Sequence, residues 1–381
     1  MFNFLSLEPK AFGLDISDLS LKIANLKRKG KFFALDSWGE TKMKPGIVTE
    51  GEIRDKKLLI EAIKKSLSDV KGEKLKTRDV IVSLPEKKAF FQVIQMPKMK
   101  KEELEAAIPF EAENYIPLSV EDVCLDFQII PSIYGYSSKH HNVLVAAIPK
   151  RIVDLYISCI KEAGLFPRAL EIESQSVCRA LIKGGFNSSP VLLIDFGRSK
   201  TSFIIFSGYS LRFTFSGSIS SQALTEAVSQ SLKVSLAEAE RLKIKYGLRT
   251  FAKNPLEKTS GAKKKAEENK IFEAMSPVLT DLIKQTKKYL DYYQTHDIAN
   301  KNVLSADKKV KEIIVCGRGV NLNGLVDFLS SELKMPVRVG NPWVNILPAP
   351  LREVPGLPFE ESLGYTAALG LALRGAREKI D

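Results

Sequence analysis

An internal duplication is the feature that most constrains the fold of this chain. Two segments share one pattern although nearly half of the sequence separates them: FGLDISDLSLKIANL, which contains Asp15, and LLIDFGRSKTSFIIF, which contains Asp195. In each segment an apolar strand ends near an aspartate, a small polar turn follows, and a second apolar strand comes next. Apolar stretches bounded by such turns predict β-hairpins. The repeat therefore predicts a duplicated, two-lobed α/β protein.

Each predicted hairpin has the groups that a phosphate-binding site needs. Backbone N–H groups of a tight turn can surround phosphate oxygens, and small residues let the backbone come close. A carboxylate at the end of a strand can hold Mg²⁺, usually through water. We therefore predict that Asp15 and Asp195 hold Mg²⁺ on a polyphosphate that lies between two facing hairpins. The alternative is that both aspartates only start ordinary turns.

The segment Ile313–Gly324, IIVCGRGVNLNG, adds a third element. We interpret it as a strand that enters a Gly-x-Gly turn, with a helix beginning near Asn323. Glycines in such a turn let an adenosine lie against the backbone. A Gly-x-Gly turn by itself is a weak signal, but its position after the two hairpins favours a nucleotide site.

The composition argues against several other classes of function. The net charge is +12, but the lysines are spread along the chain without an aromatic-interleaved basic stripe, so we expect no nucleic-acid binding. No apolar run approaches the roughly 18 residues of a membrane span. Four scattered cysteines predict reduced thiols in a cytosolic protein. The residues Met1–Leu7 lack a secretory-signal pattern, which leaves a lead-in segment or a brief membrane-touching segment.

The residues between the duplicated hairpins predict an inserted β/α subdomain that runs from Phe90 to about Pro167. Its expected elements are strands at Phe90–Met96, Asp126–Ile130 and Val143–Ile148, a helix at Lys100–Ala112 that Pro109 interrupts, and a helix at Arg151–Ala163. We also expect a turn at His140–His141, a loop at Gly184–Pro190, a flexible surface loop at Phe251–Lys270, and helices at Ser276–Thr295 and Leu363–Gly375.

The order of these elements resembles the actin-like ATPase superfamily and, within it, the type IV pilus assembly PilM family. Asp15 and the segments Asp195–Ser202 and Cys316–Val320 look like its two phosphate motifs and its adenosine motif. The segments that look like PilM are FEAENYIP (Phe110–Pro117), AEAERLKIKYG (Ala237–Gly247), LDYY (Leu290–Tyr293), GLVDFLSSEL (Gly324–Leu333) and ALGLALRG (Ala368–Gly375). The resemblance covers nearly the whole chain.

The resemblance implies an actin-like (ribonuclease H-like), two-lobed, duplicated α/β fold with an inserted PilM-type 1C subdomain. Subdomain 1A would comprise residues 1–84 with 168–189 and 362–381, and subdomain 1C residues 85–167. The second lobe would comprise residues 190–361, with a 2B-like insertion at about 232–309.

The resemblance also implies that ATP and Mg²⁺ are the cofactors. The implied nucleotide-binding residues are Asp15, Ser17, Ser20, Lys22, Gly197, Lys200, Thr201, Ser220, Ser221, Glu240, Lys243, Gly317, Arg318 and Gly319, with Asp15 and Asp195 also at the metal. Glu173 is the first candidate to orient a water for hydrolysis and Gln175 the second. Glu173 alternatively complements a helix N-terminus, and Glu240 with Lys243 alternatively forms a solvated ion pair.

The implied function is that of a cytoplasmic scaffold, peripheral to the inner membrane, that binds the N-terminal peptide of PilN in a groove between subdomains 1A and 1C. Other platform and motor proteins of the pilus would be further partners. The expected peptide-contact residues are Phe90, Phe91, Val93, Leu104, Ile108, Phe110 and Tyr115. The alternative for these apolar side chains is the core of the subdomain.

Three departures from the family pattern bear on the nucleotide. Ser17 stands where a glycine is usual, Ser220–Ser221 where a Gly-Gly pair is often found, and Arg318 where a second glycine is usual. Arg318 would either obstruct the adenine or stack on it. We therefore expect at most a slow ATPase, with a nucleotide-free scaffold with a degenerate cleft as the alternative.

Two further alternatives use the same fold. A sugar kinase is disfavoured because no substrate-phosphorylating aspartate motif is evident. A membrane-associated filament protein similar to FtsA would carry a C-terminal amphipathic helix after a linker, whereas this sequence stops at Asp381, just after the last predicted helix.

Overall fold

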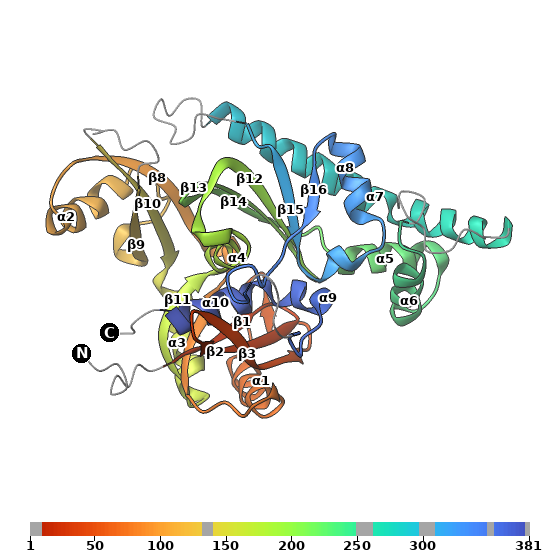
Figure 1. Cartoon of the computed structure of the whole chain (residues 1–381), viewed down its shortest axis with the longest axis horizontal. Helices are drawn as coiled ribbons and strands as arrows, with labels where there is room; N and C mark the ends of the chain where they lie inside the picture. Colours follow the sequence, from red (N-terminus) through yellow and green to blue (C-terminus); the bar gives the residue numbers. More distant parts are fainter. Residues whose placement is uncertain (1–9, 132–139, 249–261, 297–308, 349–353, 378–381) are drawn as a thin grey trace. The chain divides into compact units, whose positions relative to one another are not determined.

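The computed structural model describes residues 10–131, 140–248, 262–296, 309–348 and 354–377 (Figure 1). The chain divides into two compact units. The first unit comprises Met1–Phe186, Tyr209–Arg212 and Asn341–Asp381, and the second comprises Asn187–Gly208 and Phe213–Gly340. The subdomain boundaries given above stay a prediction.

A six-stranded sheet forms the centre of the first unit, in the order β11-β7-β1-β2-β3-β6. Its strands are β1 (Phe12–Ile16), β2 (Ser20–Lys29), β3 (Phe32–Lys42), β6 (Lys71–Gly72), β7 (Asp79–Leu84) and β11 (Phe166–Ile172). β1 pairs with β2 as an antiparallel hairpin and with β7 in parallel. Every residue of β1 is buried, as expected for a strand that helices cover on both faces.

Helices pack on both faces of this sheet. They are α1 (Lys56–Ser68), α3 (Lys150–Glu162), α4 (Glu173–Leu181) and α10 (Thr366–Arg377), with the short α9 (Phe359–Ser362) before the last. Leu14 belongs to the core that contains the apolar residues of α1 and α3. The next residue back, Gly13, faces α10, where an added Cβ would lie 2.4 Å from the Ala368 carbonyl oxygen. Because neighbouring residues of a strand point to opposite faces, the two helix pairs lie on opposite sides of the sheet.

A separate three-stranded antiparallel sheet, in the order β8-β10-β9, belongs to the first unit. Its elements are β8 (Phe90–Pro97), α2 (Lys101–Ala112), β9 (Val123–Ile130) and β10 (His140–Pro149). A small hairpin of β4 (Val48–Thr49) and β5 (Glu52–Ile53) lies elsewhere in the same unit.

Two predictions in this region were wrong. α2 continues through Pro109. The carbonyl that loses its helical partner there belongs to Glu105, which is exposed, so water can satisfy it. His140 and His141 do not form a turn but begin β10, opposite Pro97 and Met96 of β8. An adjacent pair of polar residues marks a turn only when no neighbouring strand pairs with it.

The second unit repeats the sheet topology of the first. Its five strands lie in the order β14-β13-β12-β15-β16, and β12 pairs with β13 in antiparallel and with β15 in parallel. The strands are β12 (Asn187–Phe196), β13 (Thr201–Gly208), β14 (Ser210–Gly217), β15 (Glu312–Cys316) and β16 (Val337–Val339). This is the order β3-β2-β1-β7-β11 of the first unit, so the duplication read from the sequence is a duplication of topology.

The helices of the second unit include the largest correction to the sequence analysis. They are α5 (Ser221–Leu232), α6 (Leu236–Tyr246), α7 (Ala262–His296) and α8 (Leu325–Leu333). α7 includes residues 262–270, which were predicted as loop, whereas residues 251–261 lie outside the described residues. This stretch has few large apolar side chains, but its Ala, Glu and Lys favour helix. Its helix continues into a buried stripe at Ile271 and Met275.

Two smaller differences remain. β12 begins at Asn187, inside the predicted loop Gly184–Pro190, and β14 was not predicted.

Among the described residues, no helix is long and apolar enough to span a membrane. The four cysteines are free thiols, as predicted, and three of them are buried.

The contact of α10 with α4 gives a test of the packing. An added Cβ at Gly370 would lie 1.9 Å from the Ser176 carbonyl oxygen. We expect Gly370→Ala to lower the free energy of unfolding by about 2–3 kcal/mol, because the two helices must move apart. Gly46→Ala is the control, since Gly46 has open space around it; its positive φ alone should cost about 1 kcal/mol. Urea unfolding measures both, and equal costs would contradict the close packing.

Candidate functional site

Asp15 is held at the end of β1 by groups from two neighbouring strands. Its Oδ1 accepts a hydrogen bond of 3.0 Å from the Ser83 hydroxyl, and Ser83 also accepts one from the Ile16 N–H at 2.9 Å. Lys22 is the cross-strand partner of Asp15 in β2, and its Nζ lies 4.0 Å from Asp15 Oδ2. Asp15 is only 6% exposed. The carboxylate is therefore fixed by one hydroxyl and neutralised by one ammonium.

The turn between β1 and β2 is closed by serines. The Ser17 N–H and hydroxyl both donate to the Ser20 carbonyl oxygen, at 3.0 and 2.9 Å. The two serine hydroxyl oxygens lie 3.1 Å apart. Ser17 thus stabilises this turn, and no residue of the turn has a positive φ that would require a glycine.

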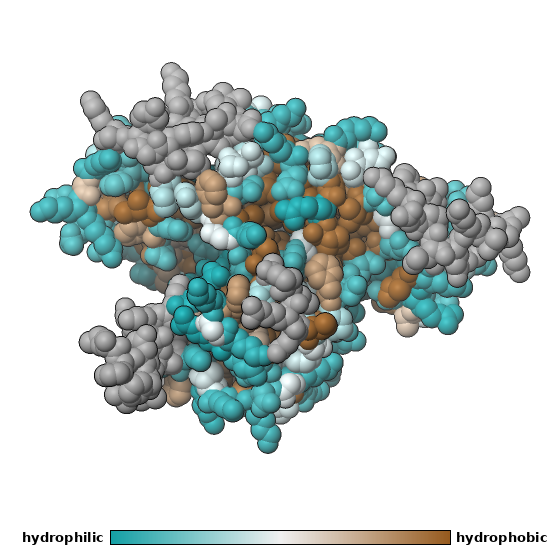
Figure 2. Space-filling view, in the orientation of Figure 1, coloured by the Kyte–Doolittle hydropathy of each residue, from teal (hydrophilic) through white to brown (hydrophobic). Residues whose placement is uncertain are grey.

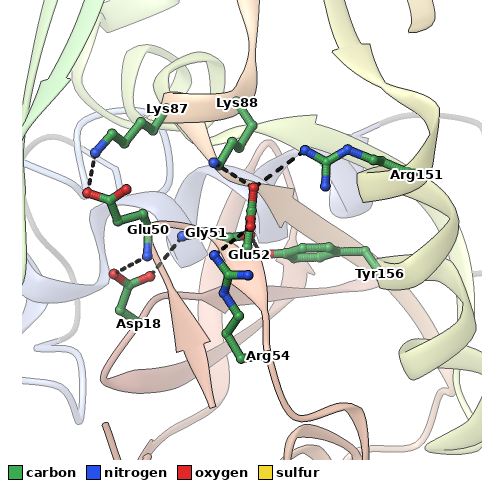
Figure 3. A network of polar contacts seen from close by, with 9 residues as sticks. All are labelled: Asp18, Glu50, Gly51, Glu52, Arg54, Lys87, Lys88, Arg151 and Tyr156. Atoms are coloured by element: carbon green, nitrogen blue, oxygen red, sulfur yellow. Dashed lines mark hydrogen bonds and ion pairs between the residues drawn. The ribbon is translucent and has the colours of Figure 1, made fainter. Parts of the chain in front are cut away.

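Asp18, in the same turn, binds the neighbouring β4–β5 hairpin (Figure 3). Its carboxylate accepts hydrogen bonds from the N–H groups of Glu50 and Gly51, at 2.9 and 3.1 Å. Both donors have positive φ angles, as in the two-residue turns of tight hairpins. The Gly51 carbonyl oxygen in turn accepts the Tyr156 hydroxyl at 3.0 Å. A continuous chain of hydrogen bonds therefore joins the first hairpin turn to α3.

Tyr156 also shows which carboxylates gather around this region. It is 1% exposed. Burial raises the pKa of its phenol well above the ordinary value, and the nearby carboxylates of Glu173, Asp18 and Asp15 add to the rise. Glu173 is thus one of the carboxylates near Tyr156, and its role in hydrolysis stays a prediction.

Ion pairs tie the β4–β5 hairpin to the segment that enters the three-stranded sheet (Figure 3). Glu52 pairs with Lys88 and Arg54, each at 2.8 Å, and with Arg151 at 3.5 Å. Glu50 pairs with Lys87. Except for the contact with Arg54, these ion pairs were missed from the sequence because they join residues that are far apart in it. The available signal was the glycine at position 51, which suits the second position of a tight hairpin turn.

The N-terminus of α4 is complemented by a residue that the sequence analysis missed. The buried Glu86, just after β7, accepts a hydrogen bond of 3.1 Å from the Ser174 N–H. A carboxylate at this position stabilises the helix N-terminus. Glu173 is buried at the first position of the same helix, and Gln175 is half-buried. Glu86 thus complements this helix terminus together with Glu173, which is the acidic residue of its first turn, so both interpretations of Glu173 stay open.

Asp195 occupies in β12 the position that Asp15 occupies in β1, one residue before the strand ends. Its cross-strand neighbours are Ser202 and Cys316. Gly317 has a φ of +87°, and a Cβ there would lie 2.4 Å from Asp195 Oδ1. A Cβ at Gly319 would lie 2.5 Å from the Phe196 ring. Both glycines of the predicted adenosine turn are therefore required by packing against the end of β12, whatever else they bind.

The second hairpin turn is bonded to the start of α5. The N–H groups of Ser221 and Gln222 donate to the carbonyl oxygens of Gly197 and Arg198, both at 3.0 Å. The Ser220 hydroxyl caps the helix by accepting the Ala223 N–H at 3.2 Å. These are the N–H groups that a phosphate at a helix N-terminus would use. In this form of the protein they have internal partners.

Two other predicted residues of the second unit, Thr201 and Gly197, stabilise the region where the second hairpin meets α5. Thr201 is fully buried, and its hydroxyl donates to the Ile219 carbonyl oxygen at 2.6 Å. Gly197 closes the hairpin turn by donating its N–H to the Lys200 carbonyl oxygen at 3.0 Å. The structure thus brings the predicted residues of the second hairpin and α5 together.

Glu240 and Lys243 form the ion pair that was the alternative for them, but only its Glu240 end is solvated, because Lys243 is buried. Its side chain is 4% exposed. Its Nζ donates to the hydroxyls of Ser221 and Thr225, at 2.9 and 2.8 Å, and pairs with Glu240 at 2.8 Å. Burial lowers the pKa of the Lys243 ammonium. Burial would raise the pKa of Glu240, but hydrogen bonds from Lys243 and Thr225 hold it below its ordinary value.

The predicted metal ligands stay a prediction. Asp15 belongs to the first unit and Asp195 to the second. Within the described ranges there is no group of three or more His, Cys, Asp and Glu side chains placed to hold a metal ion. Arg318, the bulky residue of the glycine turn, is exposed.

The predicted partner residues fall into three groups. The first group is Leu104 and Ile108. Both side chains are 0% exposed and belong to the core between α2 and the sheet, and Phe90 packs against this core. Phe91 lies on the other face of the sheet, against the core of α1 and α3. Val93 is on the same face as Phe91, two residues on.

The third group is Phe110 and Tyr115, which are 76% and 49% exposed. The side of α2 that packs on the sheet carries Leu104 and Ile108. Phe110 lies on the opposite side of the helix and points away from the sheet. The predicted peptide contacts therefore do not form one continuous surface, and Leu104 and Ile108 are not available to a partner.

Comparison with known proteins identifies the family. Residues 13–376 match the model of the family described as type IV pilus assembly protein PilM. This chain belongs to that family. A structure described as a PilM-PilN type IV pilus biogenesis complex is 26% identical, with a TM-score of 0.77 over 97% of this chain and 100% of that one. The predicted PilM family and the predicted actin-like fold are both confirmed.

More distant relatives agree on the fold. MreB5 of Spiroplasma citri bound to ADP is 12% identical, with a TM-score of 0.50 over 94% of each chain. The cell division protein FtsA of Enterococcus hirae is 25% identical over 192 residues, which are 49% of this chain and 41% of FtsA. The PilM-family chain thus aligns with less than half of that curated relative.

The Lys243 cluster predicts a pH-dependent stability. Lys243→Met should lower the free energy of unfolding at pH 7 by about 1–3 kcal/mol, because Glu240 loses its charged partner. This expected loss of stability is smaller than for a fully buried ion pair, because the Glu240 side chain is 45% exposed. The folded-state pKa of Glu240 lies below 4.5, so its contribution is present above that pH and is lost as the pH falls through the folded-state value.

Urea unfolding at several pH values measures this difference, which should shrink in acid. Arg241→Met is the control, since Arg241 pairs with Glu238 at an exposed position; it should change the stability by less than about 0.5 kcal/mol. A difference that stays constant through the acidic range would contradict the assignment to Glu240.

Proposed function

We propose that this PilM-family chain is a cytoplasmic scaffold of a type IV pilus assembly platform and binds the N-terminal peptide of PilN. The observation that carries the proposal is the similarity, over the full length of both chains, to a PilM described in complex with PilN. Through PilN the scaffold would sit at the inner membrane, where further platform and motor proteins would be its other partners.

The edge of β8 is the best place for the PilN peptide. β8 is an end strand of the sheet β8-β10-β9, and an end strand offers backbone groups to which an extended peptide can add. On one face of β8, Phe91 and Val93 lie opposite Ala146 and Leu144 of β10. Phe91 and Val93 are half-buried. They leave apolar surface for the peptide on the side of the sheet that is turned toward the core of α1 and α3.

We expect Val93→Lys to weaken binding of a labelled PilN N-terminal peptide about tenfold or more, because a charge replaces an apolar contact beside the peptide strand. Fluorescence anisotropy measures the affinity, and thermal unfolding checks that the variant stays folded. Phe110→Ser, on the far side of α2, is the control and should bind as wild type does. Loss of binding in the control but not in Val93→Lys would contradict this location.

We also propose that this chain binds Mg-ATP through its two hairpins. The donor set fits a polyphosphate: the hydroxyls of Ser17 and Ser20 and the ammonium of Lys22 lie together in the first hairpin. Lys200 offers a second ammonium in the turn of the other. Asp15 and Asp195 would hold the waters of Mg²⁺. The triphosphate would supply the negative charge that Lys22, Lys200 and Mg²⁺ balance.

Glu173 would orient water for a slow hydrolysis, with Gln175 as the second choice. Its burial in the same region as Asp15 supports this role. Specific observations also favour the second candidate function, a scaffold that binds no nucleotide. The first N–H groups of α5 already bond the turn of the second hairpin, and Asp15 is already paired. ATP would have to displace some of these contacts.

Calorimetric titration with Mg-ATP decides between the two. We expect the wild type to bind and both Asp15→Ala and Asp195→Ala to lose most of the affinity, since each removes one side of the metal site. Asp36→Ala is the control. Asp36 lies in β3, away from the hairpin turn, and pairs with Lys27 of β2 at 2.7 Å. A folded wild type that binds PilN peptide but not Mg-ATP would establish the nucleotide-free scaffold.

A further inference from the structure

The charge of the α2 region is opposite to that of the chain. The protein as a whole carries +12, but residues 102–130 contain no Lys or Arg. The acidic residues of this stretch are Glu102, Glu103, Glu105, Glu111, Glu113, Glu121, Asp122 and Asp126. All except Glu111 are exposed. Among the described residues, only Glu105 has a lysine partner, Lys101 at 3.5 Å. The segment is therefore a local acidic surface on a basic protein.

An exposed aromatic residue stands in the middle of this surface. Phe110 is 76% exposed, more than any aromatic side chain elsewhere in the described ranges. Glu103, Ala106 and Glu113 are seven, four and three positions from Phe110, so they share its side of the helix. We call these four residues the outer face of α2. Figure 2 shows hydrophobic residues directly beside hydrophilic ones over α2 and the neighbouring strands.

The outer face contributes little to the fold of its own subdomain: Glu103 accepts the Lys100 N–H at the start of α2, at 2.9 Å, but the outer face supplies no contact with the sheet. Leu104, Ile108 and Ala112 supply the contacts of α2 with the sheet, and all three are buried. Tyr115 and Leu118 extend the apolar surface just beyond the helix, at 49% and 39% exposure. Apolar side chains with a polar rim are typical of interaction sites, where the central aromatic residue provides most of the affinity.

We propose that the outer face of α2 binds a Lys- and Arg-rich segment of a partner protein, with one apolar side chain of that segment against Phe110. Charge complementarity selects this occupant, because carboxylates around an aromatic anchor attract basic segments. The same carboxylates repel an anionic membrane. The exposed basic segment Lys27–Lys31 makes a second copy of this chain the competing occupant, which the test below separates from a partner protein.

This surface goes beyond the PilN site proposed above. Phe91 and Val93 lie on the opposite face of the sheet from α2. The chain can therefore contact two partners through one small subdomain, and a variant on one face should leave the other site intact.

The test uses the full chain and a short labelled amphipathic peptide of Lys and Leu, with a Glu and Leu peptide of equal length as the charge control. Anisotropy should show binding of the basic peptide only, weakened by added salt. Phe110→Ser and the charge reversal Glu103→Lys with Glu113→Lys should each weaken it about tenfold or more. The reversal Glu273→Lys with Glu332→Lys, at exposed positions of the second unit, is the matched control and should bind normally.

Several results would overturn the proposal. One is absence of binding to the basic peptide, or binding that the outer-face variants do not change. Self-association in sedimentation that Phe110→Ser abolishes, without peptide binding, would assign the face to a second copy. Binding to anionic vesicles through the same residues would assign it to the membrane. PilN peptide binding, measured in parallel, should be unchanged in Phe110→Ser, so failure here is separate from failure of the PilN proposal.

Discussion

Both units depend on the same arrangement of hydrogen bonds around one central strand. β1 pairs with the antiparallel β2 on one side and the parallel β7 on the other, and β12 pairs in the same way with β13 and β15. Each central strand is buried and ends beside a hairpin turn and a parallel strand end. An aspartate one residue before that end is thereby fixed by its neighbours, which is why Asp15 and Asp195 occupy matching places in the two sheets.

The close packing around these strand ends explains residues that pattern reasoning had assigned to a ligand. Gly317 and Gly319 make room for Asp195 and Phe196, and the start of α5 bonds the turn of the second hairpin. The serines at these positions use their hydroxyls internally: Ser17 closes the first hairpin turn and Ser220 caps α5. A nucleotide would bind here by exchanging internal hydrogen bonds for bonds to phosphate, which lowers the net gain from each contact.

The inserted subdomain separates two kinds of surface with one sheet. Its end strand and inner face are turned toward the core of α1 and α3, and α2 covers the other face. The ion pairs of Glu50 and Glu52 join the entry to this subdomain, at Lys87 and Lys88, to the hairpin that Asp18 also binds. Peptide binding at β8 and phosphate binding at the first hairpin would thus act on one connected network.

The sequence by itself determined the two hairpins, most helices and the family, because these follow from local apolar patterns and from motifs of adjacent residues. It did not determine which apolar residues face a partner: Leu104 and Phe110 look alike in the sequence, and only the sheet beneath α2 makes one core and the other surface. Ser83, Glu86 and Tyr156 were also invisible to it. Ser83 reaches Asp15 across 68 residues and Tyr156 reaches Gly51 across 105, and contacts over such separations exist only once the chain has folded.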